Sequence, residues 1–299
     1  MSRSQAIIRL LILVFVLGFL CAVLLSPTTA APLEPSATTL HVSFIDVGQG
    51  DSALLQTSDG VNVLIDGGPG AAGPTVVAYL QNHGVDALDV VVMSHGHEDH
   101  IGGLVDLFQS AIPVLAVVYN GQPCYTSACL DVWAEMQARG LTPTPAVAGQ
   151  TYAWGPISAA VANPQPTPVG NQNEDSVVLR VGYGQEYFLF TGDIGTSTED
   201  TLLARGVPLA AEVLKVAHHG SRYSSSAAFL AAVDPDFAVI AVGAGNPYGH
   251  PTQETLGRLR AAGACIFRTD RDGTLTVFTD GQTLSWKITC VAFLPLVER

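Results

Sequence analysis

Short apolar runs alternate with helical periodicities along the chain from about residue 40 onwards. Runs bounded by Gly, Asp or Asn, with apolar or alternating positions, predict strands. We expect strands at 40–46, 52–58, 61–66, 88–94, 112–119, 156–163, 176–183, 186–192, 212–219, 237–243, 265–270, 273–280 and 283–290. Apolar positions at helical spacing predict helices at 73–83, 130–139, 197–205, 224–233 and 252–262.

These elements fall into two β-rich blocks, each followed by helices. The runs between residues 156 and 192 resemble consecutive antiparallel strands. Because a sheet with one apolar face must bury it against another layer, we expect a layered α/β fold. The predicted architecture is an αββα sandwich of two mixed β-sheets with outer helices, formed by one domain over residues 39–299.

The first 38 residues have the pattern of a targeting segment. Arg3 and Arg9 precede an unbroken apolar run over 10–25, and a small, Pro-rich stretch follows. This order is typical of a secretory signal, here cut near Ala30. The run is slightly shorter than the ~20 residues of a membrane-spanning helix, so an uncleaved anchor is a close alternative. Either way we expect an extracytoplasmic protein, secreted or held at the membrane by this segment alone.

Charge and cysteine content narrow the picture further. The net charge is −13, so the surface as a whole does not attract polyanions by long-range electrostatics. Beyond Cys21 the chain has four cysteines, and an even number in an oxidising compartment suggests two bridges, Cys124–Cys129 and Cys265–Cys290. Four unrelated thiols are the alternative.

Polar residues with useful chemistry follow the ends of several predicted strands. The run 88–94 leads directly into the stretch SHGHEDHIGG, which holds three histidines and two acids in six positions. Other groups of this kind follow four further strands: Asp66, Asp193, the pair His218 and His219, and His250. Because functional loops commonly gather at one end of the strands in layered α/β proteins, we expect these side chains to converge.

The histidine stretch has the spacing of a two-metal site. His95 and His97 can bring two imidazoles to one ion, whereas Asp99 and His100 point differently and suit a second ion beside it. Imidazole with carboxylate is a ligand set for Zn²⁺, Mn²⁺ or Fe²⁺. The alternative is a helix N-cap at Asp99 with the histidines exposed on a loop.

The motif His95-x-His97-x-Asp99-His100 resembles the signature of the metallo-β-lactamase superfamily. Further stretches are similar, in the same order, to the soluble domain of ComEC-type DNA-uptake proteins: HVSFIDVGQGDSALL, VLIDGG, NEDSVVLRV, FLFTGD, LKVAHHGS, NPYGHP and RTDRDGTLTV. The resemblance spans about 41–291. It implies an αββα fold, two divalent transition-metal ions (Zn²⁺ or Mn²⁺) and a hydrolase with a nuclease role.

The resemblance also assigns roles to single residues. Metal ligands would be His95, His97, Asp99, His100, Asp193 as the bridging carboxylate, and His250. Asp66 would orient the metal loop from behind. His219, in HHGS, would lie beside a substrate phosphate and act as general acid, with its neighbour His218 as the alternative; Asp99 also belongs to the predicted catalytic group. A helix cap at Ser221 is the purely structural interpretation of HHGS.

One family feature is missing. The superfamily usually supplies another histidine between the first cluster and Asp193, and this chain has none there. Asp175 or Ser176 is the predicted substitute, or water. The remaining Gly-rich motifs, DVGQGDS and RTDRDG, are interpreted first as hairpin turns, the former closed by an Asx hydrogen bond.

Three functional interpretations follow. The first is a phosphodiesterase or nuclease, with a phosphodiester substrate such as DNA. The second is hydrolysis of a lactone, thioester or β-lactam by the same centre. The third is a metal-binding module without catalysis. The acidic charge weighs against nucleic acid and favours a small phosphodiester or an envelope polymer within the first interpretation.

Overall fold

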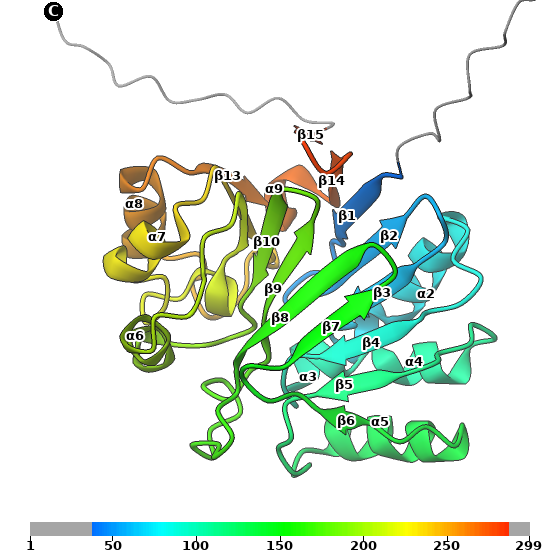
Figure 1. The fold of residues 1–299 in the computed structure, drawn as a ribbon. Coiled ribbons are helices and arrows are strands. Elements are labelled where there is room, and N and C mark those ends of the chain that lie inside the picture. Colours follow the sequence, from blue (N-terminus) through cyan, green and yellow to red (C-terminus); the bar gives the residue numbers. More distant parts are fainter. Residues whose placement is uncertain (1–37, 287–299) are drawn as a thin grey trace, which may run out of the picture. The chain divides into compact units, whose positions relative to one another are not determined.

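Two β-sheets carry the fold, with helices on their outer faces (Figure 1). The computed structural model describes residues 38–286. The first sheet has the strand order β15-β14-β1-β2-β3-β4-β5-β6. Its strands are β1 (Leu40–Phe44), β2 (Ala53–Thr57), β3 (Asn62–Ile65), β4 (Val90–Met93), β5 (Val117–Tyr119), β6 (Thr144–Pro145), β14 (Leu275–Thr279) and β15 (Leu284–Trp286).

The second sheet has the order β13-β12-β11-β10-β9-β8-β7. Its strands are β7 (Thr151–Trp154), β8 (Ile157–Asn163), β9 (Val178–Tyr183), β10 (Glu186–Phe190), β11 (Val213–Lys215), β12 (Phe237–Ile240) and β13 (Cys265–Arg268). Each sheet is mixed. β3, β4 and β5 run parallel in the first sheet, and β10, β11, β12 and β13 run parallel in the second.

Alternation along the strands creates three apolar layers. Residues such as Leu55 and Val92 of the first sheet meet Leu179 and Phe188 of the second in the central layer. Their strand neighbours point the other way: Leu54 packs under the helices that cover the first sheet, and its layer is separate from the central one. Each sheet thus buries one face against the other sheet and the opposite face against helices. This four-layer order confirms the predicted αββα sandwich.

The helices divide between the two outer faces. The first sheet is covered by α2 (Gly73–Asn82), α4 (Leu104–Gln109) and α5 (Ser127–Ala138), and the second by α6 (Thr196–Ala204), α7 (Ala227–Val233) and α8 (Gln253–Ala261) (Figure 1). Short helical segments complete the chain: η1 (Gly70–Ala72), α3 (Glu98–Ile101), η2 (Ala217–Gly220) and α9 (Thr269–Asp272). Side-chain caps start three helices, since Thr126, Ser226 and Thr252 each accept from a backbone N–H three residues on.

Most predicted elements are present, with shorter bounds. The predicted strand 112–119 is reduced to β5, while β6, β7, α3 and α4 have no counterpart in the prediction. The consecutive antiparallel strands β8, β9 and β10 are confirmed. So is the hairpin at DVGQGDS, where the Gly48 N–H donates to Asp46 Oδ1 at 3.1 Å.

The prediction of a hairpin at RTDRDG is wrong. β13 pairs with β12 in the second sheet, whereas β14 pairs with β1 in the first, so α9 joins the two sheets. Thr269 anchors this crossing through its hydroxyl, which bonds both the N–H and the carbonyl of Val242. Gly and Asp are common both in hairpin turns and in connections between sheets, so the composition of this stretch did not distinguish the two structures.

The N-terminal segment and Cys290 lie outside the described residues. Residues 1–37 of the predicted targeting segment and the predicted Cys265–Cys290 bridge therefore stay predictions. Within 38–286, no helix combines the length and the apolar character needed to cross a bilayer.

Candidate metal centre

The loop after β4 brings two histidines together. β4 ends at Met93, and His97 precedes α3 with extended backbone, so the intervening loop turns sharply. His95 Nε2 and His97 Nδ1 lie 3.0 Å apart. His95 is buried and His97 is partly exposed, so the pair lies at the edge of the central layer. Two ring nitrogens at this distance can bind one ion together.

Asp66 orients the same loop from the end of β3. Its Oδ1 accepts the Ser94 N–H at 2.7 Å, and its Oδ2 accepts the Ser94 hydroxyl at 2.6 Å. Its Oδ2 also lies 2.8 Å from His100 Nδ1. When the Nδ1–H group of an imidazole donates a hydrogen bond to a carboxylate, the lone pair on Nε2 is left free to bind a metal ion. In His100 that atom faces Asp193 Oδ1 at 3.3 Å.

Asp193 and His219 arrive from the second sheet. Asp193 follows β10, and His219 lies in η2 directly after β11. His219 Nε2 lies 3.2 Å from Asp99 Oδ2 and 3.5 Å from Asp193 Oδ2. Its Nδ1 lies 2.9 Å from the Ala241 carbonyl oxygen, to which it donates when Nε2 is free. His219 is thus oriented in the same manner as His100.

These atoms are suited to metal ions. Within residues 38–286, five atoms of this cluster are buried and form no hydrogen bond: Asp51 Oδ1, His100 Nε2, Asp193 Oδ1, His219 Nε2 and His250 Nδ1. Buried polar atoms without hydrogen-bond partners are rare, and a bound ion would satisfy them. Ligand atoms from His95, His100 and Asp193 lie within 4.8 Å of one another, as do those from Asp99, His100 and His219. His100 belongs to both trios, and His100 and His219 face different oxygens of Asp193.

The carboxylates give the site a strong preference for positive charge. Burial alone raises the pKa of Asp193, but His219 and His100 outweigh it and hold that pKa well below its usual range. Burial lowers the pKa of His219, yet Asp193 and Asp51 raise it to about 9. The same competition, led by Asp193, raises the pKa of His100 well above its ordinary value. The cluster therefore stabilises cations, as a metal site must.

His218 and His250 occupy the more open side of the cluster. His218 Nε2 lies 3.9 Å from Asp193 Oδ2, and its side chain is 32% exposed. The His250 ring lies 5.6 Å from the His218 ring and stacks on Tyr248. His250 belongs to none of the ligand trios among the described residues. The geometry thus brings His219, rather than His250, against Asp99 and Asp193.

Three of the site residues have backbone conformations that are uncommon outside glycine. Asp66, His218 and His219 have φ values of 58°, 50° and 52°. Non-Gly residues in the left-handed region each cost on the order of 1–3 kcal/mol and cluster at functional sites. The turns that present these side chains are therefore held by their surroundings and not by local preference.

Asp175 and Ser176, predicted to replace the missing histidine, form hydrogen bonds with neighbouring loop residues. Asp175 accepts the backbone N–H groups of Val169, Gly170 and Asn171 at 2.8–3.2 Å, and the side-chain amide of Gln122 at 3.0 Å. Ser176 Oγ accepts the Asp193 N–H at 3.1 Å. Asp175 is therefore occupied by N–H donors, while Ser176 fixes the backbone of Asp193.

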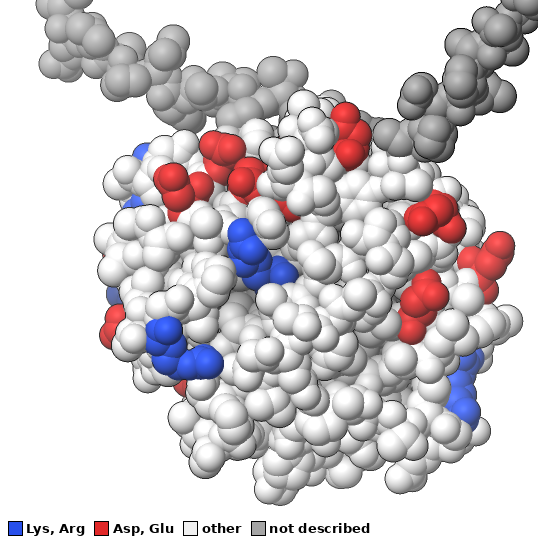
Figure 2. Space-filling view, in the orientation of Figure 1, with Lys and Arg blue, Asp and Glu red and all other residues white. Residues whose placement is uncertain are grey.

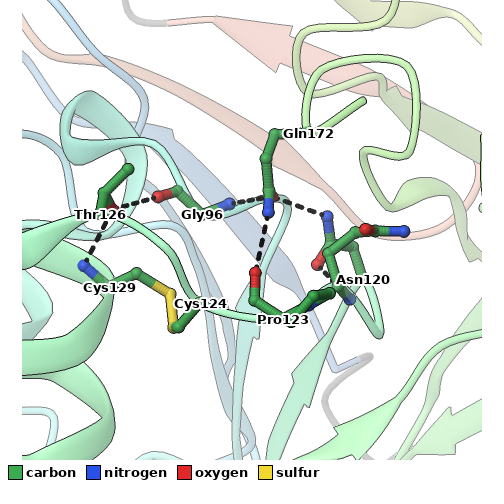
Figure 3. Close-up of a disulfide and its surroundings, with 8 residues drawn as sticks. Gly96, Asn120, Pro123, Cys124, Thr126, Cys129 and Gln172 are labelled. Atoms are coloured by element: carbon green, nitrogen blue, oxygen red, sulfur yellow. Dashed lines mark hydrogen bonds between the residues drawn. A yellow bond between two sulfur atoms is a disulfide. The ribbon is translucent and has the colours of Figure 1, made fainter. Parts of the chain in front are cut away.

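A loop closed by a disulfide contacts Gly96, the residue between His95 and His97 (Figure 3). Cys124 and Cys129 are bridged, as predicted. Inside that loop, the Thr126 hydroxyl donates to the Gly96 carbonyl at 3.3 Å. On the other side Gln172 Oε1 accepts the Gly96 N–H at 3.0 Å, and Gln172 Nε2 donates to the Pro123 carbonyl at 3.3 Å. Both backbone groups of Gly96 are therefore held by side chains from distant segments.

A sequence model of the metallo-beta-lactamase superfamily matches residues 45–244, a range that contains every residue of the two ligand trios. The chain belongs to the metallo-β-lactamase superfamily.

Relatives of this metallo-β-lactamase domain include two larger proteins. It is 36% identical over 250 residues to competence protein ComA of Neisseria gonorrhoeae, covering 82% of this chain and 33% of that protein. It is 28% identical over 254 residues to ComE operon protein 3 of Bacillus subtilis strain 168, covering 79% of this chain and 32% of the relative. The chain therefore spans about a third of the length of these relatives, and the predicted resemblance is confirmed.

Solved structures show the same superfamily fold. A metal-dependent hydrolase of the beta-lactamase superfamily superposes with a TM-score of 0.50 at 17% identity, covering 80% of this chain and 98% of the other. At this identity the similarity supports the fold alone.

Sequence reasoning missed two charged residues of this metallo-β-lactamase site. Asp51 was interpreted as part of a turn, and Lys215 as an ordinary strand position. In the structure both are buried beside the histidines, at 6% and 4% exposure. A signal was present: Lys215 is one of only two lysines in the chain, and it interrupts the apolar run EVLKVA. A charge inside a buried strand needs a partner, and that requirement points to a polar cluster.

Proposed function

We propose that this chain is a hydrolase that uses two divalent metal ions, Zn²⁺ or Mn²⁺, to cleave phosphodiesters. The observation that carries the proposal is the convergence of His100 Nε2, Asp193 and His219 Nε2, buried and without hydrogen bonds. Each of the two imidazoles is oriented by a group bonded to its other nitrogen. Oriented imidazoles that face buried carboxylates without forming hydrogen bonds are better explained by metal binding than by structural packing.

The ligand assignment follows the distances. His95, His97 and Asp193 would hold the first ion, and Asp99, His100, His219 and the other oxygen of Asp193 would hold the second. This assignment gives His219 the ligand role that the sequence analysis expected of His250, and leaves proton donation to His218, the alternative named there. Two ions held by these residues would lower the pKa of a bound water toward neutral and would neutralise charge on a phosphoryl oxygen.

The chain itself supplies the remaining functions. His218 lies beside Asp193 with a third of its side chain exposed, so it can reach a bound substrate. We assign it the donation of a proton to the leaving oxygen, a role for which imidazole is suited. His250 lies on the far side of His218 and would orient that ring or the substrate. Asp66 and Ser94 hold in place the loop after β4 that carries His95 and His97.

The phosphodiester class is supported by the relatives. Competence protein ComA matches 82% of this chain. The resemblance to ComEC-type DNA-uptake proteins implies a nuclease role, and such a role requires phosphodiester chemistry. The overall charge of −13 opposes long-range attraction of DNA. On the face shown in Figure 2, acidic and basic side chains are scattered over a largely uncharged surface without a basic stripe. Short or small phosphodiesters are therefore the preferred substrates within the class.

A substrate panel tests this proposal. The purified chain, loaded with Zn²⁺ or Mn²⁺, is assayed on an aryl phosphodiester, single-stranded DNA, double-stranded DNA, a thioester, a lactone and a β-lactam, with His97→Ala as control. We expect the aryl phosphodiester to be cleaved and the carboxylic esters and amides not to be. Cleavage of the thioester or lactone alone would contradict the phosphodiester assignment while retaining the hydrolase.

Export is proposed on the sequence alone. Cell fractionation should find the chain outside the cytoplasm, and recovery of the whole population in the cytoplasm would contradict it.

A further inference from the structure

A buried ion pair lies behind the metal centre. Lys215 is the last residue of β11, and its ammonium group contacts Asp51 Oδ2. Asp51 lies in the β1–β2 connection of the other sheet, two residues before β2, so the pair joins the two sheets. Both side chains are nearly inaccessible, with exposures of 8% for Asp51 and 5% for Lys215. A buried charge pair is costly to form and is therefore weak evidence for a purely stabilising role.

Asp51 touches the second ligand set at three points. Its Oδ1 lies 3.3 Å from His219 Nδ1, and its Oδ2 lies 3.6 Å from His100 Nδ1. Its backbone N–H donates to the carbonyl oxygen of Asp99 at 3.1 Å. One residue thus reaches the rear of two imidazoles and the backbone of a carboxylate ligand.

Lys215 extends these contacts to the fourth ligand. Its ammonium nitrogen lies 3.5 Å from the Gly192 carbonyl oxygen, immediately before Asp193. The backbone carbonyl of Lys215 accepts the hydroxyl of Thr191 at 2.7 Å, which fixes the same loop to β11. The ion pair therefore links all three segments that carry the second ligand set.

The pair approaches the ligands from the core and not from the substrate side. Asp51, Lys215, Asp66 and Ser94 line a small cavity of about 20 Å³ between the sheets, together with apolar residues such as Phe44. Burial alone raises the pKa of Asp51, but Lys215, His100 and His219 lower it to about 2, so this carboxylate is ionised. The ammonium group of Lys215 contacts Asp51, and a positive charge at this position offsets the repulsion among the buried carboxylates.

We infer that Asp51 and Lys215 form one positioning unit that sets the affinity of the second metal ion through His219, His100 and the loop of Asp193. This inference rests on the proposed two-metal centre. Neither residue touches substrate, so the unit acts on the ligands alone. Groups that orient metal ligands typically change metal affinity by 10–100-fold when removed.

Stepwise metal binding tests the inference. Zn²⁺ affinity of the metal-stripped full chain is measured by competition with a chromophoric chelator, for wild type, Asp51→Asn, Lys215→Met and the double variant. We expect each single variant to weaken the second binding step by roughly 10–100-fold and the first step much less, because the first ion shares only Asp193 with the second set. Because the pair acts as a unit, the double variant should lose no more affinity than the worse single variant.

Controls separate the possible failures. Asp51→Asn keeps the shape of the side chain and alone suffices for the test if Lys215→Met does not fold, which thermal unfolding of the metal-free variants reveals. Glu186→Gln alters a buried carboxylate at the opposite end of β10 and should leave both steps unchanged. Unaltered second-step affinity in Asp51→Asn, or equal losses in both steps, would overturn the inference. A wild-type chain that binds no metal would instead overturn the proposed function.

Discussion

His219 and Asp99 come from opposite sheets, yet His219 Nε2 lies 3.2 Å from Asp99 Oδ2. Asp99 is reached through the loop after β4, and His219 through the turn after β11. Because the parallel strands of each sheet end at the same edge, the sandwich brings these two turns together. The contact joins the HxHxDH motif to the HHGS motif and defines the second ligand set.

The first prediction separates two late histidines. His219→Ala should lose one of two metal ions per chain, because His219 Nε2 faces both Asp99 and Asp193. His250→Ala should retain both ions, because its ring contacts His218 and Tyr248 instead. Elemental analysis of each variant after gel filtration measures this. Loss of an ion from His250→Ala and not from His219→Ala would restore the assignment made from the sequence.

The second prediction concerns proton donation by His218. His218→Ala should keep both ions but lower turnover by roughly 10²–10⁴-fold on a phosphodiester with an alcohol leaving group, as for a missing general acid. The loss should be much smaller with nitrophenolate, which leaves without a proton. The two substrates are compared by kcat at saturating concentration. Equal losses on both would exclude the proposed role.

The third prediction concerns the disulfide loop. Replacing Cys124 and Cys129 together by Ser should lower the free energy of unfolding by about 2 kcal/mol, as for a short closed loop. It should also speed hydrogen exchange at the Gly96 amide, because the contacts that hold Gly96 come from this loop and from Gln172. Urea unfolding and exchange measurements test the two effects, with the amides of β4 as internal control. Unchanged exchange at Gly96 would show that the bridge does not support the metal loop.

The fourth prediction compares two glycines. A methyl group on Gly103 would overlap the carbonyl oxygen of Gly67, so Gly103→Ala should lower the free energy of unfolding by roughly 1–3 kcal/mol, as overpacking does. A methyl group on Gly257, inside α8, would meet nothing within 4 Å. Gly257→Ala should raise the free energy of unfolding by about 1 kcal/mol, the helix propensity difference. Thermal and urea unfolding measure both, and equal effects would contradict the close packing at Gly103.

Much of the fold could be predicted from the sequence because the strands alternate cleanly. Leu54 and Leu55 point to different apolar layers, which is the pattern that predicts a sheet between two neighbours. Short elements were missed because two to four residues carry too little periodicity, as in β6 and α3. The crossing at α9 was missed because its turn residues serve hairpins equally well.

The sequence predicted which residues form the candidate site better than it predicted the role of each residue. The HxHxDH spacing and the strand-end positions of Asp66, Asp193 and His219 carried enough information to expect convergence. Which late histidine faces Asp99 depends on the turn after β11, where His218 and His219 both have positive φ. No sequence pattern specifies that geometry. Asp51 and Lys215 were missed because their partnership exists only once the two sheets pack together.

The central claim is a hydrolase whose activity requires two bound ions, and one titration tests it directly. The metal-stripped chain is titrated with Zn²⁺ or Mn²⁺ while hydrolysis of an aryl phosphodiester is followed. We predict no hydrolysis before metal is added and a plateau of activity at about two ions per chain, the number that the two ligand sets accommodate. Full hydrolysis by the metal-stripped chain, or none at any metal concentration, would contradict the account.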